Sequence, residues 1–453
     1  MKSMWTKFIG ILNKLTPAQL IVIFYFIAVS VSVILLTLPV AHNPGVEVNF
    51  IDALFTAVSA VSVTGLSVVS IADTFSVTGV FLLAFVLQFG GIGVMALGTF
   101  IWLVMGRKIG LRERKLIMID QNQTNLSGLV SLLKHILIIM LVVEACGALI
   151  LGTYFLNYFP TWQEAYLHGF FASVSATTNG GFDITGASLV PFANDYFVQF
   201  ITMLLITLGA IGFPVLIEVK DFLFSKEMKR YRFSLFTKLT TLTFLMLIVF
   251  GMLMILILEF NHFFHGKSWH QTFFYALFQS VTTRSGGLST MDIGQFTDST
   301  LLVICGLMFI GASPSSVGGG IRTTTFALNI LFLFHFARGK KNIKLFKREI
   351  HHDDVTKSLV VTMMAILLCF SSMVILSITE PFSLLEILFE VCSAFGTTGL
   401  SMGITPYMSD IGKIIIMILM FIGRIGILSF LFLISKKAVD PNYHYPKERL
   451  IIG

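Results

Sequence analysis

The chain has 453 residues, of which 55% are hydrophobic and only 12% are charged, whereas soluble globular proteins are nearer a quarter charged. This composition, with a mean hydropathy of +0.87, excludes a set of soluble domains and predicts an all-α integral membrane protein. The net charge of +7 could suggest a nucleic-acid partner, but the basic residues are distributed in a way that excludes one.

Eight apolar stretches are long enough to cross a bilayer, which takes about 20 helical residues. They are 20–39, 76–105, 136–158, 196–217, 239–258, 301–336, 358–379 and 414–435. Lys and Arg gather near the amino terminus and after every second stretch, as in "RKIGLRERK". The positive-inside rule therefore predicts that both termini lie in the cytoplasm. A cleaved signal peptide is not expected, because the first apolar run is too long.

Between the two stretches of each pair lies a shorter apolar segment that ends in Ser or Thr, then Gly, then Leu or Phe. These segments read "FIDALFTAVSAVSVTGLS", "WQEAYLHGFFASVSATTNGGFD", "WHQTFFYALFQSVTTRSGGLS" and "FSLLEILFEVCSAFGTTGLS". One glycine of each, Gly65, Gly181, Gly287 and Gly399, recurs at intervals of roughly 110 residues, which indicates an internal repeat. The segments are too short to span the membrane and fit a re-entrant helix followed by an extended strand.

The predicted architecture is four linked repeats, each a span, a pore helix, a filter strand and a second span. The expected divisions are a cytoplasmic amino terminus at 1–15, repeats at 16–115, 116–225, 226–348 and 349–435, and a cytoplasmic tail at 436–453. Each repeat crosses the membrane twice, so all four have one orientation and can close around an axis along the bilayer normal. Four glycine-containing strands around one axis can present rings of backbone carbonyls to an ion, and the carboxyl ends of the short helices favour a cation. The predicted filter residues are Val63, Thr64, Gly65, Asn179, Gly180, Gly181, Ser285, Gly286, Gly287, Thr397, Thr398 and Gly399.

The second span of each repeat contains a similar short motif, "FGGIGV", "LGAIGF", "IGASPS" or "IGRIGI". Alignment of these motifs places Gly91, Ala210, Ala312 and Arg424 at the same position. Only the third of these spans is expected to break, at "GASPSSVGGG". A phosphate-binding loop is excluded there, because G-x-x-x-x-G-K-[ST] is not present. We expect instead an intramembrane gate loop that faces Arg424 across the pore, and the alternative for Arg424 is a charge satisfied by helix carbonyls. The predicted gate residues are Gly311, Ala312, Ser313, Pro314, Ser315, Ser316, Gly318, Gly319, Gly320 and Arg424.

The remaining charged residues leave alternatives open. Glu144 is either part of a proton relay or a structural carboxylate paired with a pore-helix or filter group, and the second is favoured because no other carboxylate is expected near the membrane centre. Arg284 is expected to point away from the axis, toward a hydrogen-bonding or acidic partner. The acidic residues on the outer side, which include Glu259, Glu380 and Glu390, form a mouth that concentrates cations or are ordinary solvated loop charges. No transition-metal spacing and no enzyme motif is present.

These motifs resemble the membrane subunit of the Ktr potassium uptake systems, in the Trk/Ktr/HKT superfamily. The resemblance covers essentially the whole chain and is carried by "DALFTAVSAVSVTGLSVV", "SATTNGGF", "QSVTTRSGGL", "FEVCSAFGTTGLSMG" and "FIGRIG". It implies that K⁺ is the transported ion, since plant members that pass sodium have serine where this chain has Gly65. The extra glycines Gly180 and Gly286 depart from the family pattern and are expected to soften selectivity against Na⁺.

The resemblance also implies partners. These are a second copy in a homodimer with one pore per protomer, and a cytoplasmic ring of nucleotide-binding RCK (KTN) subunits that opens the gate with ATP and closes it with ADP. The nucleotide is bound by that partner, and Na⁺ is implied as an activator. The basic loops at 220–238 and 338–357 and the tail are the expected docking surfaces, with anionic membrane lipid as an alternative ligand there.

Three functions remain. The first is a gated pore that imports K⁺ down its electrochemical gradient, driven by roughly 2.3 kcal/mol per charge per 100 mV. The second is a symporter that couples K⁺ to H⁺ or Na⁺. The third is a non-conducting membrane sensor or scaffold, in which the filter glycines would be dispensable.

Overall fold

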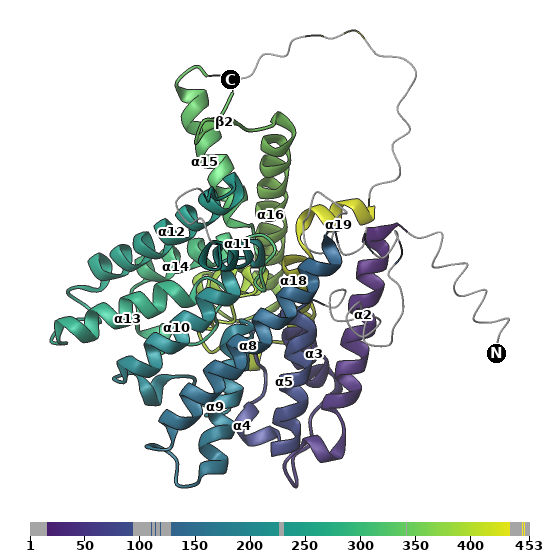
Figure 1. Ribbon diagram of the computed structural model, residues 1–453. Helices are drawn as coiled ribbons and strands as arrows, with labels where there is room; N and C mark the ends of the chain where they lie inside the picture. Colours follow the sequence, from purple (N-terminus) through teal and green to yellow (C-terminus); the bar gives the residue numbers. More distant parts are fainter. Residues whose placement is uncertain are drawn as a thin grey trace.

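The structure is a computed structural model that describes residues 16–93, 110, 114, 118, 128–225, 231–340, 342–434, 446 and 448. This part of the chain is mostly helical, as Figure 1 shows. The predicted amino-terminal segment 1–15 and nearly all of the tail 436–453 lie outside the described residues, as do most of the basic segment 107–115 and residues 226–230.

The same order of elements occurs four times along the chain. Each group begins with one long helix, and the four are α2 (Pro17–Leu36), α8 (Leu129–Phe155), α12 (Leu235–Glu259) and α16 (His352–Thr379). Each is followed by a short helix: α3 (Phe50–Ser62), α9 (Trp162–Thr177), α13 (Trp269–Thr282) and α17 (Leu384–Gly396). Then come α5 (Val77–Gly91), α10 (Tyr196–Ala210), α14 (Asp298–Ile310) and α18 (Asp410–Ile425), and the last three continue as α11 (Phe213–Leu223), α15 (Thr323–Ala337) and α19 (Ile427–Ile434).

The connecting segments hold the smaller elements. These are α4 (Ile71–Thr74), the 3₁₀ turns η1 (Pro39–Ala41), η2 (Val190–Phe192), η4 (Ile293–Gln295) and η5 (Thr405–Tyr407), and the antiparallel strands β1 (Lys344–Leu345) and β2 (Arg348–Glu349). The hairpin departs from the all-α expectation. It lies where α15 and the start of α16 project beyond the other helices at the top of Figure 1, within the basic loop at 338–357.

The four long helices are apolar on their outer faces, where side chains such as Ile34, Leu149, Met246 and Ile378 are 62–80% exposed. Exposed large apolar side chains on this scale fit contact with lipid rather than water. Within the described residues, α2, α8, α12 and α16 are long and apolar enough to cross a membrane, and α10 with α11 makes a fifth such span if the pair counts as one. The chain is therefore a multi-pass membrane protein.

The expectation that only one span breaks is wrong. Helices α10 and α11 meet at 105°, with Gly212 between them at φ 102°, and Gly426 separates α18 from α19 at φ 88°. Gly93, at φ 92°, follows the end of α5. Each is the last glycine of "GGIG", "GAIG" or "GRIG". Only glycine adopts such angles without strain, so glycine at this position permits the break.

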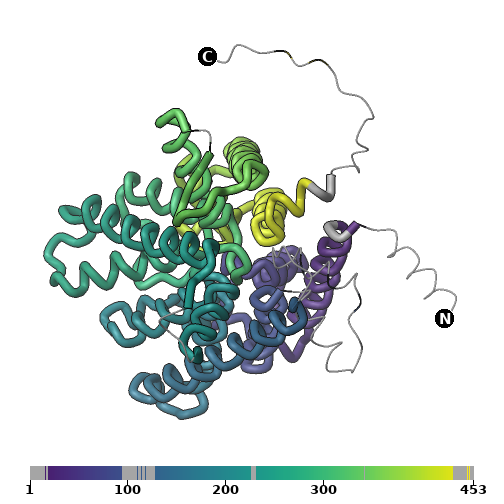
Figure 2. The backbone as a smooth tube through the Cα atoms, turned by 45° about the horizontal axis from the view of Figure 1, so that its top comes forward, coloured from purple at the N-terminus to yellow at the C-terminus, as the bar shows by residue number. Residues whose placement is uncertain are grey.

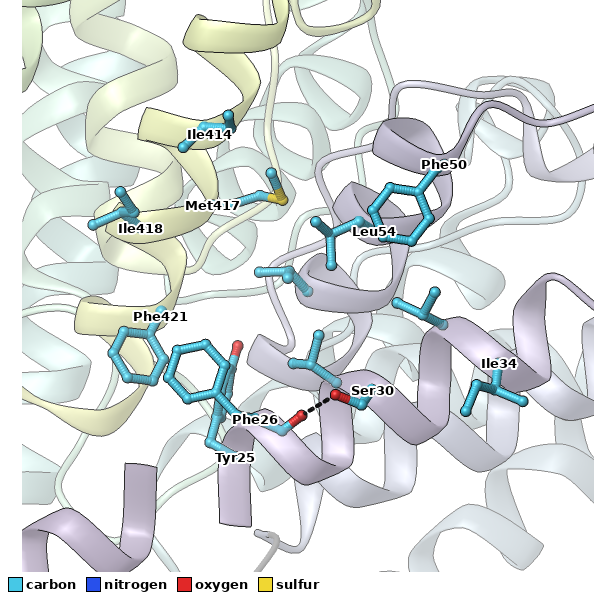
Figure 3. Close-up of a pocket in the computed structure, with 13 residues that line it drawn as sticks. Tyr25, Phe26, Ser30, Ile34, Phe50, Leu54, Ile414, Met417, Ile418 and Phe421 are labelled. Carbon is cyan, nitrogen blue, oxygen red and sulfur yellow. Dashed lines mark hydrogen bonds between the residues drawn. The ribbon is translucent and has the colours of Figure 1, made fainter. Parts of the chain in front are cut away.

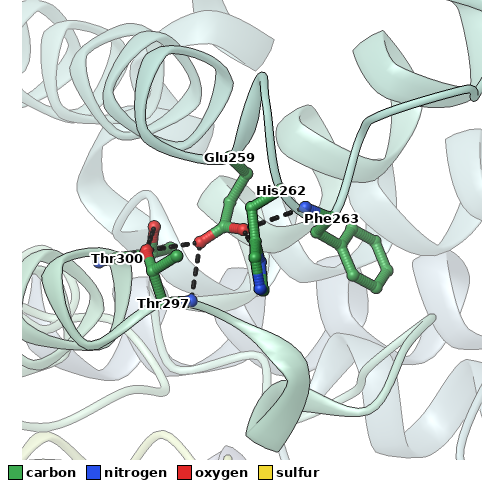
Figure 4. Close-up of polar contacts among 5 residues, drawn as sticks. All are labelled: Glu259, His262, Phe263, Thr297 and Thr300. Atoms are coloured by element: carbon green, nitrogen blue, oxygen red, sulfur yellow. Dashed lines mark hydrogen bonds and ion pairs between the residues drawn. The ribbon is translucent and has the colours of Figure 1, made fainter.

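The carboxyl ends of α12 and α16 are each bound to the start of the helix that follows the short one. Figure 4 shows Glu259, the last residue of α12, which accepts hydrogen bonds of 2.8 Å from both the N–H and the hydroxyl of Thr297, the N-cap of α14. Glu380 accepts from the N–H of Ser409, the N-cap of α18, in the same way at 3.1 Å. Both carboxylates are buried, so for these two residues the alternative of ordinary solvated loop charges is wrong.

The first and last helices of the chain lie side by side, which closes the structure around the short helices. Figure 2 shows the purple first helices beside the yellow last ones, and α18 contacts α3. Lys413 Nζ lies 2.7 Å from Asp52 Oδ1, with the two side chains only 10% and 18% exposed. Next to this ion pair an apolar groove of about 550 Å³ runs between α2, α3 and α18 (Figure 3).

Candidate functional site

The carboxyl ends of the four short helices share one unusual backbone conformation. Val63, Asn179, Ser285 and Thr397 have φ of 56°, 53°, 66° and 47°, which is the left-handed region. Left-handed angles are unfavourable for residues with a Cβ and most of all for a β-branched one such as Val63. Strain of this kind costs about 1–3 kcal/mol per residue and persists where the surrounding structure imposes it, often at functional sites.

Two residues after each strained position comes one of the predicted filter glycines, and the structure brings the four into a closed ring. A Cβ added at Gly181 would lie 3.0 Å from Cα of Gly287 and 3.2 Å from Cα of Gly65, and one at Gly399 would lie 3.0 Å from Cα of Gly65. A Cβ at Gly287 would lie 3.4 Å from Cα of Gly399. We call these four residues the glycine ring. Their φ values run from 68° to 92°, so both backbone angle and space require glycine.

Backbone oxygens lie close to the glycines of this ring. A Cβ at Gly65 would lie 2.7 Å from the carbonyl oxygen of Gly180, and one at Gly287 would lie 2.5 Å from that of Thr398. The carbonyl oxygen of Thr64 is similarly the nearest atom to a Cβ at Gly399. The residues just before the ring glycines therefore direct polar backbone atoms toward the neighbouring strands, the arrangement from which carbonyl coordination of a cation is built.

Hydroxyl groups of the short helices hold the strands that carry the ring. Ser59 Oγ accepts the N–H of Gly65 and Ser393 Oγ accepts the N–H of Gly399, both at 3.1 Å. Ser175 donates to the carbonyl of Phe182 at 2.6 Å. Sequence reasoning missed these serines, although each stands six residues before its ring glycine.

Glu390, like Glu259 and Glu380, is buried where a solvated loop charge was one of the expectations. It was expected among the outer acidic residues, but it lies in α17 with none of its surface exposed. Its carboxylate accepts hydrogen bonds from the Ser401 hydroxyl at 2.5 Å, the Met402 N–H at 3.1 Å and the Thr405 hydroxyl at 2.9 Å. It therefore fixes the segment that leaves the fourth ring strand, so Glu144 is not the only buried carboxylate in the membrane-embedded part.

The predicted gate segment 311–320 is a loop that packs directly against the ring strands. A Cβ at Gly318 would lie 2.5 Å from Ser285 Oγ, and one at Gly319 would lie 2.6 Å from Thr397 Oγ1. The loop is also hydrogen-bonded to the second group of helices, since Val317 N–H donates to the carbonyl of Gly209 at 3.1 Å.

Further backbone bonds fix the two sides of the loop. Ser313 N–H donates to the carbonyl of Ala210 and Ala312 N–H to that of Gly319, at 3.1 and 3.2 Å. Phe213 N–H, just beyond the α10–α11 break, donates to the carbonyl of Ser315 at 2.8 Å. The loop thus satisfies carbonyls that the broken helix α10 leaves open, as irregular backbone in a membrane must.

The structure brings Arg424 to this loop, as expected. Its guanidinium donates to the carbonyl of Val317 and to that of Gly90 in α5. Arg322, which sequence reasoning did not assign to the site, donates to the carbonyls of Ser313 and Gly318. Two arginine side chains therefore fix the backbone of the loop. The loop has a defined conformation although it belongs to no helix.

The partners of Arg284 agree with the expectation, whereas the partner of Glu144 does not. Arg284 points to backbone carbonyls of α14 and the loop, which confirms that it has hydrogen-bonding partners. Glu144 accepts from Gln88 Nε2 at 2.7 Å. Because Gln88 belongs to α5, the expectation of a pore-helix or filter partner is wrong. In the described residues, no cluster of three His, Cys, Asp or Glu side chains could hold a metal ion.

Comparison with known proteins gives a consistent result over nearly the whole chain. The TrkH family model, described as "Cation transport protein", matches residues 11–444. The Ktr system potassium uptake protein D of Bacillus subtilis is 69% identical over 99% of both chains, and the Ktr system potassium uptake protein B of the same organism is 35% identical over 97% of both. The potassium/sodium uptake protein NtpJ of Enterococcus hirae is 33% identical over 97% of this chain and 98% of its own length.

A solved structure supports the fold. The crystal structure of the potassium transporter TrkH from Vibrio parahaemolyticus superposes with a TM-score of 0.68, at 21% identity, over 86% of this chain and 79% of that one. From the extent of the family match and the identity of these relatives, the chain belongs to the TrkH family of cation transport proteins.

Proposed function

We propose that this chain is the pore-forming subunit of a potassium uptake system, with the glycine ring as its selectivity filter. The observation that carries the proposal is the closed ring of four glycines, with carbonyl oxygens of the preceding residues packed against it. Four groups of elements, each a long helix, a short helix, a strand and a divided helix, would then be four repeats with eight spans around one axis. The repeats correspond to 16–115, 116–225, 226–348 and 349–435.

The short helices support the choice of a cation. All four end at the strands of the ring, and the carboxyl end of a helix carries a partial negative charge equivalent to about half an electron. Potassium is the proposed ion because the relatives at 69% and 35% identity are named as potassium uptake proteins. Glycine at all four ring positions, without a side chain to narrow the ring, supports K⁺ over Na⁺.

The 311–320 loop is the proposed gate. It lies against Ser285 and Thr397 of the ring strands, and a cavity of about 320 Å³ lined by Pro314, Gly320 and Arg322 borders it. Movement of the loop into that cavity would open the pore, and the bonds from Arg424 and Arg322 would hold it shut. Deleting Ser315 to Val317 removes the Arg424 contact and is expected to raise basal cation flux.

We further propose the partners and regulation that go with a Ktr system. The chain would act as a homodimer with a cytoplasmic nucleotide-binding ring that opens the gate with ATP and closes it with ADP, and with Na⁺ as activator. Helices α15 and α16 with their basic hairpin project beyond the rest (Figure 1), which supports this surface as a docking site. Both termini would then face the same, cytoplasmic side.

The test is ion flux in liposomes that contain the purified protein. Wild-type protein should carry K⁺ in preference to Na⁺, and the current should reverse at the K⁺ equilibrium potential whatever the proton or sodium gradient. Reversal that follows either gradient would establish the symporter instead. An absence of flux in both the wild type and the loop-deleted protein would favour a sensor or scaffold.

A further inference from the structure

Arg284 breaks the similarity of the four ring strands at one position. Three residues before the ring glycine, the other strands have Ser62, Thr178 and Gly396, and only the third has a charged residue. None of the surface of Arg284 is exposed. An arginine buried within a membrane protein is costly and is expected to serve a specific contact.

The contacts of Arg284 join the ring strand to the start of the loop. Its Nη2 donates to the carbonyl of Leu307 in the last turn of α14 and to Thr283 Oγ1, the latter at 3.4 Å. Its Nη1 donates to the carbonyl of Gly311 at 3.4 Å. Gly311 is the first residue of the loop and, at φ 62°, the point at which the helix ends.

The carbonyl of Leu307 accepts a hydrogen bond from Arg284, whereas in a continuous helix it would accept one from the backbone. In an unbroken α14 it would accept the N–H of residue 311, four residues on. That N–H donates instead to the carbonyl of Met308 at 3.0 Å. The guanidinium therefore replaces a hydrogen bond that the helix gives up where the loop begins, and it does so from the filter side.

On its other side Arg284 is continuous with the ring. Ser285, the next residue, is in the left-handed conformation and donates from Oγ to the carbonyl of Gly396 at 3.0 Å. Gly287 of the ring follows two residues later. A shift of the loop hinge at Gly311 must therefore either break the contacts of Arg284 or pull on the third ring strand.

We propose that Arg284 is a positioning residue that couples the glycine ring to the gate loop, an inference that rests on the proposed function of both. Coupling is reciprocal. An ion that stabilises the ring favours the loop position in which the arginine contacts are made, and a loop held open loosens the third ring strand. The same repeat that carries the arginine carries the long loop, which is why the other strands need no such side chain.

The test is Arg284→Lys in the full-length protein in liposomes, with K⁺ and Na⁺ flux measured without any partner. Lysine keeps the charge, but its single ammonium cannot reach both carbonyls in the planar geometry of arginine. We expect basal K⁺ flux to rise roughly tenfold, since a hydrogen bond to a charged group shifts a two-state equilibrium by at least about that factor, and the preference for K⁺ over Na⁺ to fall.

The same substitution is then made in protein that lacks Ser315 to Val317. Coupling predicts that Arg284→Lys changes basal flux little further there, because the loop is already released, while the loss of ion preference persists. Effects on flux that multiply in the two backgrounds would overturn the inference, because they would mean that arginine and loop act independently.

A milder pair of variants covers the case in which the lysine variant does not fold. Thr283→Val removes the hydroxyl that contacts the guanidinium, and Thr177→Val is the same change at the equivalent position of the second strand. We expect Thr283→Val to raise flux and Thr177→Val to leave it unchanged, whereas equal effects would overturn the inference. A wild-type protein without selective K⁺ flux would instead refute the proposed function itself.

Discussion

Substitution of Gly399 by alanine separates the two reasons for glycine in the ring, which are the backbone angle and the lack of space for a Cβ. Gly403 is the matched control, because it has the same backbone angle but free space around it. Gly399 has φ 90° and Gly403 has φ 89°. Alanine at either residue meets the same backbone strain, about 1–3 kcal/mol. Only at Gly399 would the new Cβ meet other atoms, the carbonyl oxygen of Thr64 and, at 3.0 Å, Cα of Gly65, whereas a Cβ at Gly403 has nothing within 4 Å.

The difference between the two variants therefore measures crowding within the ring. The atoms in the way are backbone atoms, so they cannot rotate aside, and overpacking of this kind costs about 1–3 kcal/mol. The ring must widen or twist to accept the methyl group. A change of about 2 kcal/mol in the relative binding of K⁺ and Na⁺ alters their ratio roughly thirtyfold.

The assay is the reversal potential of reconstituted protein in mixed K⁺ and Na⁺, with thermal unfolding measured on the same samples. Gly403→Ala is expected to lower the unfolding temperature slightly and to keep the wild-type preference for K⁺. Gly399→Ala is expected to lose most of that preference. If the two variants show the same selectivity, the glycine is needed only for its backbone angle, and the ring geometry does not set the choice of ion.

Two further predictions concern charged groups away from the ring. Asp52→Lys and Lys413→Asp should each lower the free energy of unfolding by roughly 3 kcal/mol, because each leaves two like charges together in a nearly buried site. The double variant with the two residues exchanged should recover much of this loss in thermal unfolding. Equal losses in the single and double variants would argue against an ion pair that closes the ring of helices. Glu144→Gln should leave K⁺ flux and its pH dependence unchanged, since an amide oxygen can still accept from Gln88; loss of transport with this variant would instead support a proton relay.

The sequence predicted that the four glycines meet, because their signal is local and repeated. The four glycines recur in similar surroundings, and their meeting in one ring follows from four segments of equal orientation. The loop was predicted from a run of Gly and Ser that no helix would contain, and Arg424 from its departure from the small residues at equivalent positions. In each case the residue type is dictated by a constraint that acts at that position alone.

The errors arose where the partner lies far along the chain. Glu390 and Glu259 stand in segments that read as the outer edge of the membrane, and only the fold shows that hydroxyls and N–H groups from later segments cover them. Gln88 is 56 residues from Glu144, and nothing in its apolar surroundings marks it as a partner. The breaks at Gly212 and Gly426 were missed for another reason, since a single glycine in a helix often causes no break and its backbone angle is not visible in the sequence.

The arginines around the loop bear on how the proposed fourfold arrangement would acquire a single gate. Four equal strands can build a filter, but four equal loops at the axis would compete for the same space. Of the three breaks that the structure describes, at α10–α11, α14–α15 and α18–α19, the one in the third group is the long loop. Three buried or half-buried arginines, Arg284, Arg322 and Arg424, donate to its carbonyls or to those at its start. Each of these contacts satisfies backbone that the helix no longer satisfies. The loss of helical hydrogen bonds at the loop and the presence of these arginines around it therefore belong to a single change. A loop held by such directed bonds would be either bound or released, and two defined arrangements are what the proposed gate requires.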